Sequence, residues 1–209
     1  MQRTRKEYKV GSSCAPTSSR HPLYLRGGVL WVFLLLLAGC GDGVISNKYC
    51  NLPARFDFRP VNSISQLYTS CESMGEWCTI TLDNSGNKFL FSKPTGAPGE
   101  ANRLAIEGYT GFYMGLSGFI VGLPNIPEMG ESIPVVTCYD LACSNCHIET
   151  GYMTRRLILQ EGGYAHCNRC LRTYDLNNTG QVTPQGPVGS PLYRYRVYYG
   201  NNTLSINNR

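Results

Sequence analysis

The sequence predicts an all-β protein, a barrel or sandwich of antiparallel strands. Short runs of alternating apolar and polar residues recur along the chain, and clusters of Gly, Pro and Asn separate them. No long stretch of the mature chain has the 3.6-residue period of an amphipathic helix. Together these observations favour many short strands joined by tight turns.

The first expected strands lie between residues 55 and 91. Residues 55–58 (RFDF) alternate in character ahead of a proline, which predicts a strand. Residues 63–76 are mixed and are expected to form a loop or one helical turn. Residues 78–82 (CTITL) and 88–91 (KFLF) flank the turn cluster DNSGN, which predicts a hairpin with a longer loop. The segment that follows, 92–107, is rich in Pro and Gly and is expected to be a loop.

Residues 108–122 carry five glycines in an apolar run, a spacing that also occurs in packed membrane helices. Two prolines soon afterwards, and the β-branched and aromatic content of the run, favour two strands with bulges or close backbone approaches. Further strands are expected beyond this run, and the last two of them should form a closing hairpin: 133–138, 155–160, 192–199 and 203–206. Residues 173–176 leave the second cysteine pair ahead of a turn at 177–180, and the family resemblance described below implies a strand there.

The N-terminal segment has the composition of an export signal. Residues 1–28 contain six basic residues and one acidic residue, and an apolar run of ten residues follows at 29–38. This run is short of the ~20 residues that a bilayer core requires. A basic segment followed by a short apolar run therefore predicts a signal peptide rather than a membrane span.

The apolar run ends in Leu-Ala-Gly-Cys, and this ending resembles the bacterial lipobox, in which the cysteine is lipidated and becomes the mature N-terminus. The alternative is an ordinary signal peptide with a chance cysteine. The resemblance implies a signal peptide at 1–39, a lipid on Cys40, a tether at 40–54 and a folded domain at 55–209. The protein is then expected in the cell envelope, lipid-anchored to a bacterial membrane on its periplasmic or surface side.

The net charge of the chain lies entirely in this predicted signal. The whole chain has 19 basic and 14 acidic residues, and residues 1–39 have six and one, which leaves thirteen of each in residues 40–209. The mature chain thus has no net charge and no basic field to attract nucleic acid, so nucleic acid is not an expected partner.

Two Cys-x-x-Cys pairs form the candidate site: Cys143 with Cys146, and Cys167 with Cys170, separated by twenty residues. Two such pairs can bring four sulfurs to one point, which suits a tetrahedral metal site or a small iron–sulfur cluster. Four further cysteines are scattered and are available for disulfides after export, although the sequence does not specify their pairing: Cys50, Cys71, Cys78 and Cys138.

The sequence around the second pair resembles the C-terminal half of a Rieske-type [2Fe–2S] domain. HCNRCLRTYDL at 166–176 is followed by a glycine turn, a Gly-Pro, a Pro-Leu and an alternating hairpin, as in that family. Upstream, YDLACSN at 139–145 is similar to the first cluster-binding loop of the family. The resemblance covers about residues 133–206 and implies a Rieske-like antiparallel barrel with metal-binding loops at 138–176.

The sequence departs from this family at the ligands. In the Rieske pattern two Cys hold one iron and two His hold the other. Cys143 and Cys167 match the cysteine positions, whereas Asn145 and Cys170 occupy the histidine positions, and Cys146 is an additional thiol. The mixed-ligand cluster of the family therefore cannot form as written.

Two histidines flank the pairs, His147 and His166, and each is a candidate additional ligand or hydrogen-bond partner of a ligand. A histidine beside a cysteine knuckle is more often a surface or packing residue. Three occupancies of the four thiols stay open: a structural Cys₄ zinc site, a [2Fe–2S] cluster held by four Cys or with His147 replacing one, and a pair of disulfides.

Two functions follow from these occupancies. One is a membrane-anchored electron-transfer module that exchanges electrons with a redox protein partner, as the Rieske resemblance implies. The alternative is a non-redox structural or binding lipoprotein whose Rieske-like fold is held by zinc or disulfides. The sequence contains no Ser/His/Asp set, phosphate-cradling loop or paired-carboxylate motif, so an independent enzyme is not expected.

Overall fold

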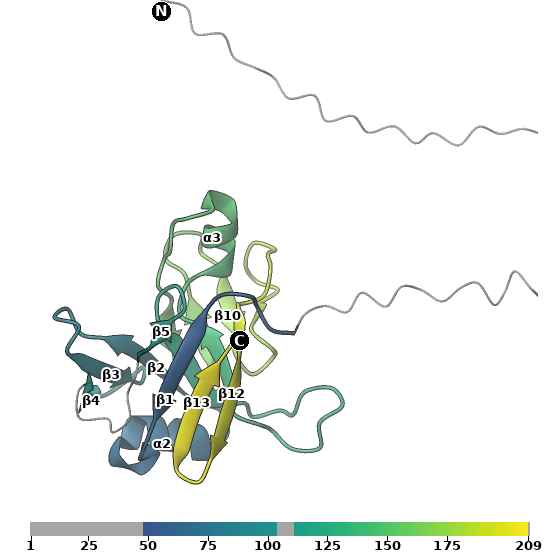
Figure 1. Cartoon of the computed structure of the whole chain (residues 1–209). Helices are drawn as coiled ribbons and strands as arrows, with labels where there is room; N and C mark the ends of the chain where they lie inside the picture. The colour runs from purple at the N-terminus through teal and green to yellow at the C-terminus, as the bar shows by residue number, and fades with distance from the viewer. Residues whose placement is uncertain (1–47, 104–110, 209) are drawn as a thin grey trace, which may run out of the picture. The chain divides into compact units, whose positions relative to one another are not determined.

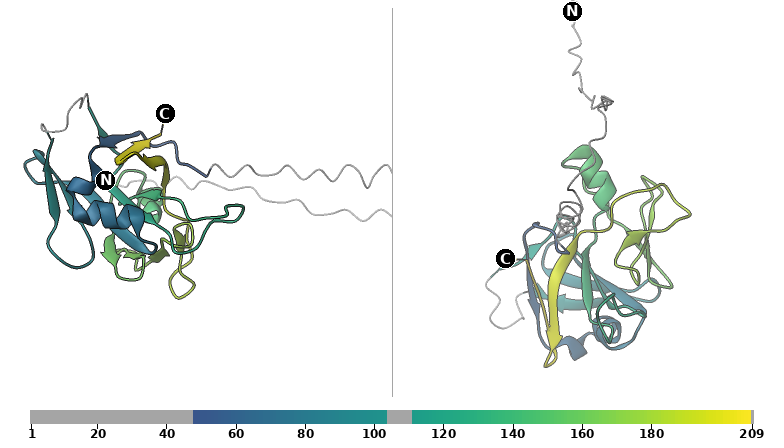
Figure 2. Two further views of the ribbon diagram at one scale, coloured as in Figure 1. Left: turned by 90° about the horizontal axis from the view of Figure 1, so that it is seen from below. Right: turned by 90° about the vertical axis from the view of Figure 1, so that its right-hand side faces the viewer.

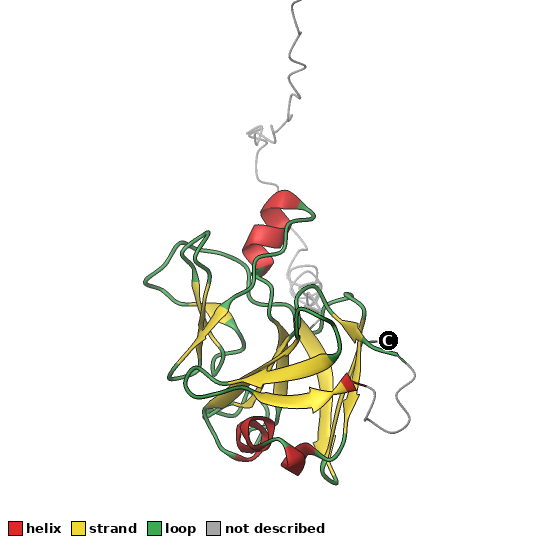
Figure 3. Ribbon diagram, turned by 90° about the vertical axis from the view of Figure 1, so that its left-hand side faces the viewer, coloured by secondary structure: helices red, strands yellow, loops and turns green. Residues whose placement is uncertain are grey.

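The computed structural model describes residues 48–103 and 111–208, which form two antiparallel sheets with two α-helices (Figures 1 and 3). The prediction of a mostly β, antiparallel fold is confirmed. The predicted signal peptide at 1–39, Cys40 and the start of the predicted tether lie outside the described residues, as do residues 104–110.

Nine strands form the larger sheet, in the order β4-β3-β2-β6-β7-β12-β13-β1-β5. Their bounds are Ala54–Phe58 (β1), Glu76–Leu82 (β2), Lys88–Ser92 (β3), Gly99–Asn102 (β4), Tyr113–Met114 (β5), Phe119–Leu123 (β6), Thr137–Asp140 (β7), Arg194–Gly200 (β12) and Thr203–Asn207 (β13). The predicted hairpins β2–β3 and β12–β13 both form. A short 3₁₀ helix, η1 (Val61–Ser63), precedes α2 (Ser65–Glu72), which packs against β2 and β6.

The larger sheet curls around one aromatic core. Phe56 on β1 and Phe89 on β3 are far apart in the strand order, yet their ring centroids lie 5.1 Å apart in an edge-to-face arrangement. Alternation along each strand supplies this core: in β1, for example, Ala54, Phe56 and Phe58 are buried while Asp57 is exposed. Burial of each such phenylalanine stabilises the fold by roughly 1.5–3 kcal/mol.

The middle strands β2, β6 and β7 are buried on both faces. Their inner face, which includes Cys78, Val121 and Cys138, joins the aromatic core. Their outer face, which includes Trp77, Ile120 and Tyr139, joins a second core. Gly122 permits this packing, because a Cβ at that position would lie 2.6 Å from the indole ring of Trp77.

Four strands form the smaller sheet, in the order β11-β10-β9-β8, and it covers the second core together with the helix α3. The bounds are Ser144–Thr150 (α3), Ile158–Gln160 (β8), Tyr164–His166 (β9), Thr173–Asp175 (β10) and Gln181–Val182 (β11). The chain leaves the larger sheet from β7 and returns to it in β12, and these two strands pair with each other. The smaller sheet and α3 are thus an insertion between neighbouring strands of the larger sheet (Figure 2).

The structure corrects two predictions in the first half of the domain. Residues 63–76 contain the eight-residue helix α2 rather than a loop or one turn, because Leu67, Ser70 and Cys71 recur with helical spacing and are buried. The expected loop at 92–107 contains β4, which pairs with β3. The two strands predicted within 108–122 form as β5 and β6, in the part of that run that the structure describes.

Further differences lie around the cysteine pairs. The strand predicted at 133–138 starts only at Thr137, because Ile133 and Val135 are exposed. The strand predicted at 155–160 is reduced to β8, with Arg156 in an isolated bridge to Ala142. The helix α3 and the short strands β9 and β11 were not predicted.

Residues 48–53, at the end of the predicted tether, contact the domain. The backbone N–H of Cys50 donates to the carbonyl of Arg194 at 2.9 Å, and Lys48 Nζ lies 2.6 Å from a carboxylate oxygen of Glu128.

Across residues 48–103 and 111–208, no helix has the length and apolar character needed to cross a membrane.

Candidate metal centre

The first cysteine pair is positioned by a buried carboxylate at the end of β7. Asp140 accepts hydrogen bonds from the backbone N–H of Ala142 and of Leu116, both at 2.7 Å, and from the hydroxyl of Tyr195 at 2.5 Å. Burial raises the pKa of Asp140, and these hydrogen bonds oppose that rise. They turn the chain sharply, so that Cys143 follows directly at the start of α3.

Cys143 is also the N-cap of α3. Its Sγ accepts a hydrogen bond from the backbone N–H of Cys146 at 3.5 Å, the interaction that a polar side chain makes at a helix start. The helix ends at Gly151, whose φ of 76° places it in the left-handed region that glycine adopts readily. The first turn of this helix therefore directs both thiols to the same side.

The second pair lies in a tight turn between β9 and β10. The backbone N–H of Cys167 donates to the carbonyl of Arg172, and the N–H of Leu171 donates to the carbonyl of Cys167, both at 2.9 Å. Leu171 has a φ of 59°. This reversal brings Cys170 back beside Cys167, opposite the first pair.

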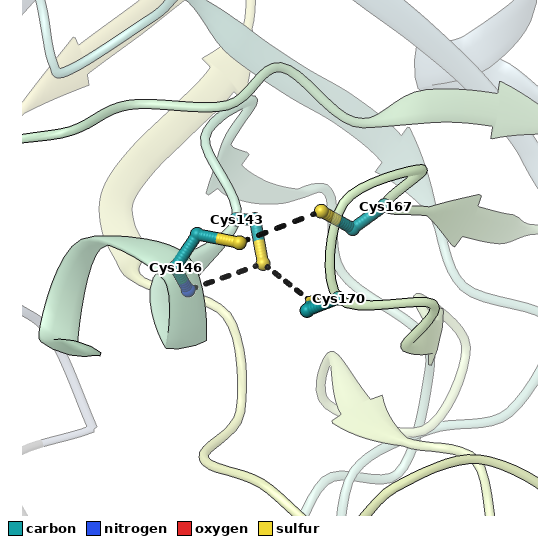
Figure 4. Close-up of side chains that lie close together, drawn as sticks. All are labelled: Cys143, Cys146, Cys167 and Cys170. Carbon is teal, nitrogen blue, oxygen red and sulfur yellow. Dashed lines mark hydrogen bonds between the residues drawn. The ribbon is translucent and has the colours of Figure 1, made fainter. Parts of the chain in front are cut away.

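The four thiols meet at one point, with all four Sγ atoms within 4.8 Å of one another (Figure 4). Two contacts join one cysteine of each pair to one of the other: Cys143 to Cys170 at 3.5 Å, and Cys146 to Cys167 at 3.7 Å. Three of the thiols are buried and Cys170 is half-buried. Four sulfurs at this spacing can hold a metal ion.

The surroundings of these thiols give them different pKa values. Burial raises the pKa of Cys143 to about 11 and raises that of Cys146 further, and neighbouring thiols contribute to the rise at Cys146. Burial also acts on Cys170, but hydrogen bonds from the backbone and guanidinium of Arg172 outweigh it and lower its pKa to about 7. Metal binding must therefore displace protons from Cys143 and Cys146.

Asn145, at the position where the Rieske pattern has a histidine, makes its side-chain hydrogen bonds to Tyr174 and Ser190. Its amide nitrogen donates to the hydroxyl of Tyr174 at 2.9 Å and to the carbonyl of Ser190 at 2.8 Å, and its oxygen accepts from the N–H of Ser190 at 2.9 Å. The two bonds with Ser190 attach the loop before β12 to the first cysteine pair, and the third attaches β10 to it. Gly189 makes room for the amide, since a Cβ there would lie 2.5 Å from its oxygen.

Tyr174 links this amide to the metal centre, because its hydroxyl also lies 3.1 Å from the Sγ of Cys143. Partners of this kind orient metal ligands and tune their basicity. Sequence reasoning placed Tyr174 on a strand but did not identify its hydroxyl as a partner of the centre. The place of Tyr174 in the strand directly after the second cysteine pair was the one sequence feature that could have indicated this contact.

The two flanking histidines contact other groups. His147 Nδ1 lies 2.9 Å from the hydroxyl of Tyr193, and His166 Nδ1 lies 3.0 Å from the hydroxyl of Thr173. Within the described ranges, the group of side chains close enough to share a metal consists of the four cysteines. Cys40, the predicted lipidation site, lies outside the described residues.

The scattered cysteines lie apart from this centre. Cys71, Cys78 and Cys138 are buried in the aromatic core, and Cys50 packs against it. None of the eight cysteines that the structure describes is joined in a disulfide. Burial raises the pKa of Cys71 to about 12 and raises those of Cys78 and Cys138 still further, so these thiols are protonated at neutral pH.

Comparison of the chain with protein-family models, with curated proteins and with solved structures finds no match. The resemblance of residues 133–206 to Rieske domains thus depends on their motifs alone.

Proposed function

We propose that the protein is a non-redox lipoprotein of the cell envelope, in which the four cysteines hold one structural Zn²⁺. The observation that carries this proposal is the mutual spacing of the four sulfurs, within 4.8 Å. A closed set of four thiolates leaves no open position for a substrate, which is typical of structural zinc. The ion would clamp α3 to the turn between β9 and β10.

The spacing favours one ion over a two-iron cluster. With Zn–S bonds of about 2.3 Å, four tetrahedral sulfurs lie ~3.8 Å apart. The distances from Cys143 to Cys170 (3.5 Å) and from Cys146 to Cys167 (3.7 Å) are close to this value. In a [2Fe–2S] cluster two cysteines bind each iron, and sulfurs on different irons are ~5 Å or more apart, which exceeds the 4.8 Å within which all four sulfurs lie. Disulfides would need sulfurs at about 2.05 Å, so both pairs would have to move together.

Electron transfer is the second candidate, because the chain order supports the Rieske resemblance. The cysteine-bearing sheet is inserted between β7 and β12 of a larger antiparallel sheet, and both cysteine pairs lie in loops of that insertion. A Rieske-like fold would have this arrangement of a base and a cluster-binding insertion. To hold a [2Fe–2S] cluster, however, the sulfurs bound to different irons would have to lie farther apart than the present 4.8 Å limit.

Metal content and absorption separate the two candidates. The full-length chain, purified without oxygen, should be colourless and contain one zinc and no iron or acid-labile sulfide. Cys167→Ala should lose the metal, whereas Cys78→Ala, which removes an equally buried thiol from the other core, should retain it. Two irons and two sulfides per chain with visible absorption bands would favour electron transfer, and quantitative disulfides without metal would contradict both.

The envelope location is proposed from the lipobox-like sequence that ends in Cys40. Cys40→Ser should block lipid attachment, so that the chain stays uncleaved or becomes soluble. Metabolic labelling with a fatty acid, followed by membrane fractionation, measures this. A cleaved Cys40→Ser chain that still sediments with membranes would contradict the proposed anchor.

A further inference from the structure

The outer face of the smaller sheet carries one row of polar side chains that crosses all four strands. Gln160 on β8 pairs with Tyr164 on β9, Tyr164 with Asp175 on β10, and Asp175 with Gln181 on β11. Directly paired residues share a face of a sheet. The residues one position along face the second core instead: Leu159, Ala165, Tyr174 and Val182.

This row forms the floor of an open cavity of about 580 Å³. Asn178 and the loop at 183–185, which includes Gln185, form its walls. Side-chain amides, hydroxyls and one carboxylate dominate the lining, and it contains no lysine or arginine. A second hollow, of about 280 Å³, shares Gln160 with the first and continues toward Glu161 and Lys93. An extended ligand could therefore follow the surface beyond the first cavity.

Much of the hydrogen-bonding capacity of this row is unused within the protein. Gln160, Tyr164, Asn178 and Gln185 make no side-chain hydrogen bond to another described residue. Each amide offers two donors and one acceptor with two lone pairs. Asp175 is fixed in place, since one carboxylate oxygen accepts from the N–H of Asn177 at 3.0 Å, which leaves the other oxygen for a ligand.

Tyr164 adds a flat apolar surface to this polar row. Its side chain is 39% exposed and lies between Gln160 and Asp175 in the row. A sugar ring has a matching character, because its C–H groups form an apolar face while its hydroxyls project around the edge as paired donors and acceptors. The ring face can stack on an aromatic side chain while the amides and the carboxylate bind the hydroxyls.

We propose that this groove, defined by Gln160, Tyr164, Asp175, Asn178, Gln181 and Gln185, binds a neutral oligosaccharide. The absence of cationic side chains from the first cavity argues against phosphate and other anions. The predominance of amides and hydroxyls argues against a lipid chain, which needs apolar walls. This activity goes beyond the metal site and does not depend on which metal the cysteines hold.

Three tetrasaccharides of different linkage and substituents test the proposal: cellotetraose, maltotetraose and chitotetraose. Each is titrated into the metal-loaded full-length chain, without sugar-based detergent, and binding is followed by ¹H–¹⁵N NMR. At least one should bind with a millimolar or tighter Kd and shift amide signals of β9, β10 and β11. No saturable shifts with any of the three at about 10 mM, tenfold above a 1 mM Kd, would overturn the proposal.

Tyr164→Ala should weaken the binding about tenfold, as expected for loss of ~1.4 kcal/mol of stacking. Tyr68→Ala, which removes a tyrosine of similar exposure (44%) from α2, should leave the Kd unchanged. Equal loss in both variants, or saturable shifts confined to residues outside the groove, would also overturn the assignment. Zinc analysis of the same samples is independent, so the groove can fail while the metal proposal stands.

Discussion

Cysteines occur in both cores of the molecule but in different surroundings. In the core of the larger sheet, Cys78 and Cys138 are surrounded by phenylalanine and aliphatic side chains. In the second core, Cys143 and Cys146 face the thiols of the opposite knuckle. Cys78 and Cys138 behave as small apolar groups, whereas Cys143 and Cys146 belong to a group of thiols that could hold a metal ion.

The sizes of the two cores explain this difference. The first contains seventeen buried residues, rich in phenylalanine. The second contains twelve, of which three are cysteines of the centre and three, Trp77, Ile120 and Tyr139, belong to the larger sheet. Only six other residues come from the insertion itself, and so small an apolar contribution usually needs a disulfide or metal to be stable.

Removal of the proposed metal should produce the largest difference in stability between the insertion and the larger sheet. Structural zinc contributes about 10–16 kcal/mol of apparent binding free energy in small domains. A chelator that removes the ion should therefore abolish hydrogen-exchange protection across residues 142–176 and leave β1, β12 and β13 protected. Exchange measured by mass spectrometry tests this, and unchanged protection of the insertion in a metal-free sample would refute the proposed clamp.

The reverse control is Phe56→Ala in the aromatic core. Loss of this ring should cost about 3–5 kcal/mol and lower the urea midpoint of the larger sheet. The fraction of chains that remains folded should still contain one metal ion. A metal content that falls in proportion to the loss of stability would show that the two cores are not separable.

Acidification should likewise affect the cysteine centre before it affects the larger sheet. Thiolate ligands compete with protons, and because the pKa of Cys143 is about 11 in the absence of metal, the proposed ion should be displaced by protons increasingly as pH falls. In the loop between β6 and β7 of the larger sheet, burial opposes ionisation of Glu128, but Lys48 and Arg194 lower its pKa below the usual 4.5. Its contribution is present above that pH and is lost only as pH falls through the lowered folded-state value.

An acid titration should accordingly release metal at a higher pH than the one at which the larger sheet unfolds. A zinc-sensitive dye reports the first event, and near-ultraviolet circular dichroism reports the second. A single coincident transition would contradict the separation.

Asn145→Ala should have an intermediate effect, confined to the insertion. The substitution leaves the Tyr174 hydroxyl and the Ser190 backbone without their amide partner, at a cost of ~1–3 kcal/mol. Metal affinity should fall roughly 10–100-fold, as is typical when the partner of a ligand is lost. A competition assay with a chelator of known affinity measures it, and Tyr174→Phe, which removes only the hydroxyl, is the matched control. Unchanged affinity in both variants would exclude a role for this network.

His147→Ala and His166→Ala should have the smallest effect. Their Nδ1 atoms contact Tyr193 and Thr173 rather than the sulfurs, so metal stoichiometry should stay at one. We expect the metal affinity to change less than about threefold, well below the loss for a residue that orients a ligand. Loss of the metal in either variant would identify that histidine as a ligand.

The strands with strong alternation were predictable from sequence, and the short elements were not. RFDF, CTITL and LYRYRVYY alternate in residue type along the sequence, and all three contribute strands. The strands β9 and β11, of three and two residues, are too short for any period to be seen. The helix α3 starts at a cysteine that serves as its N-cap, a residue outside the usual capping set.

The candidate site was likewise predictable from the sequence only in part. Cys-x-x-Cys spacing identified the four thiols, because the local turn that presents a pair is encoded within a few residues. The partners of these thiols come from distant segments: Tyr174 and Ser190 lie 29 and 45 residues from Asn145. Such contacts depend on how the sheets pack, and single-sequence patterns do not contain that information.

The insertion begins and ends on paired strands, which makes it a transplantable module. Asp140 and Tyr193 are joined by a backbone hydrogen bond of 2.9 Å, so the two ends of the cysteine-bearing segment lie side by side where they leave the larger sheet. Protein engineers could exchange the segment for another without altering the register of the host sheet, provided that the apolar strip of Trp77, Ile120 and Tyr139 stays covered. The larger sheet then serves as a stable carrier on which the chemistry of the inserted lobe can diversify.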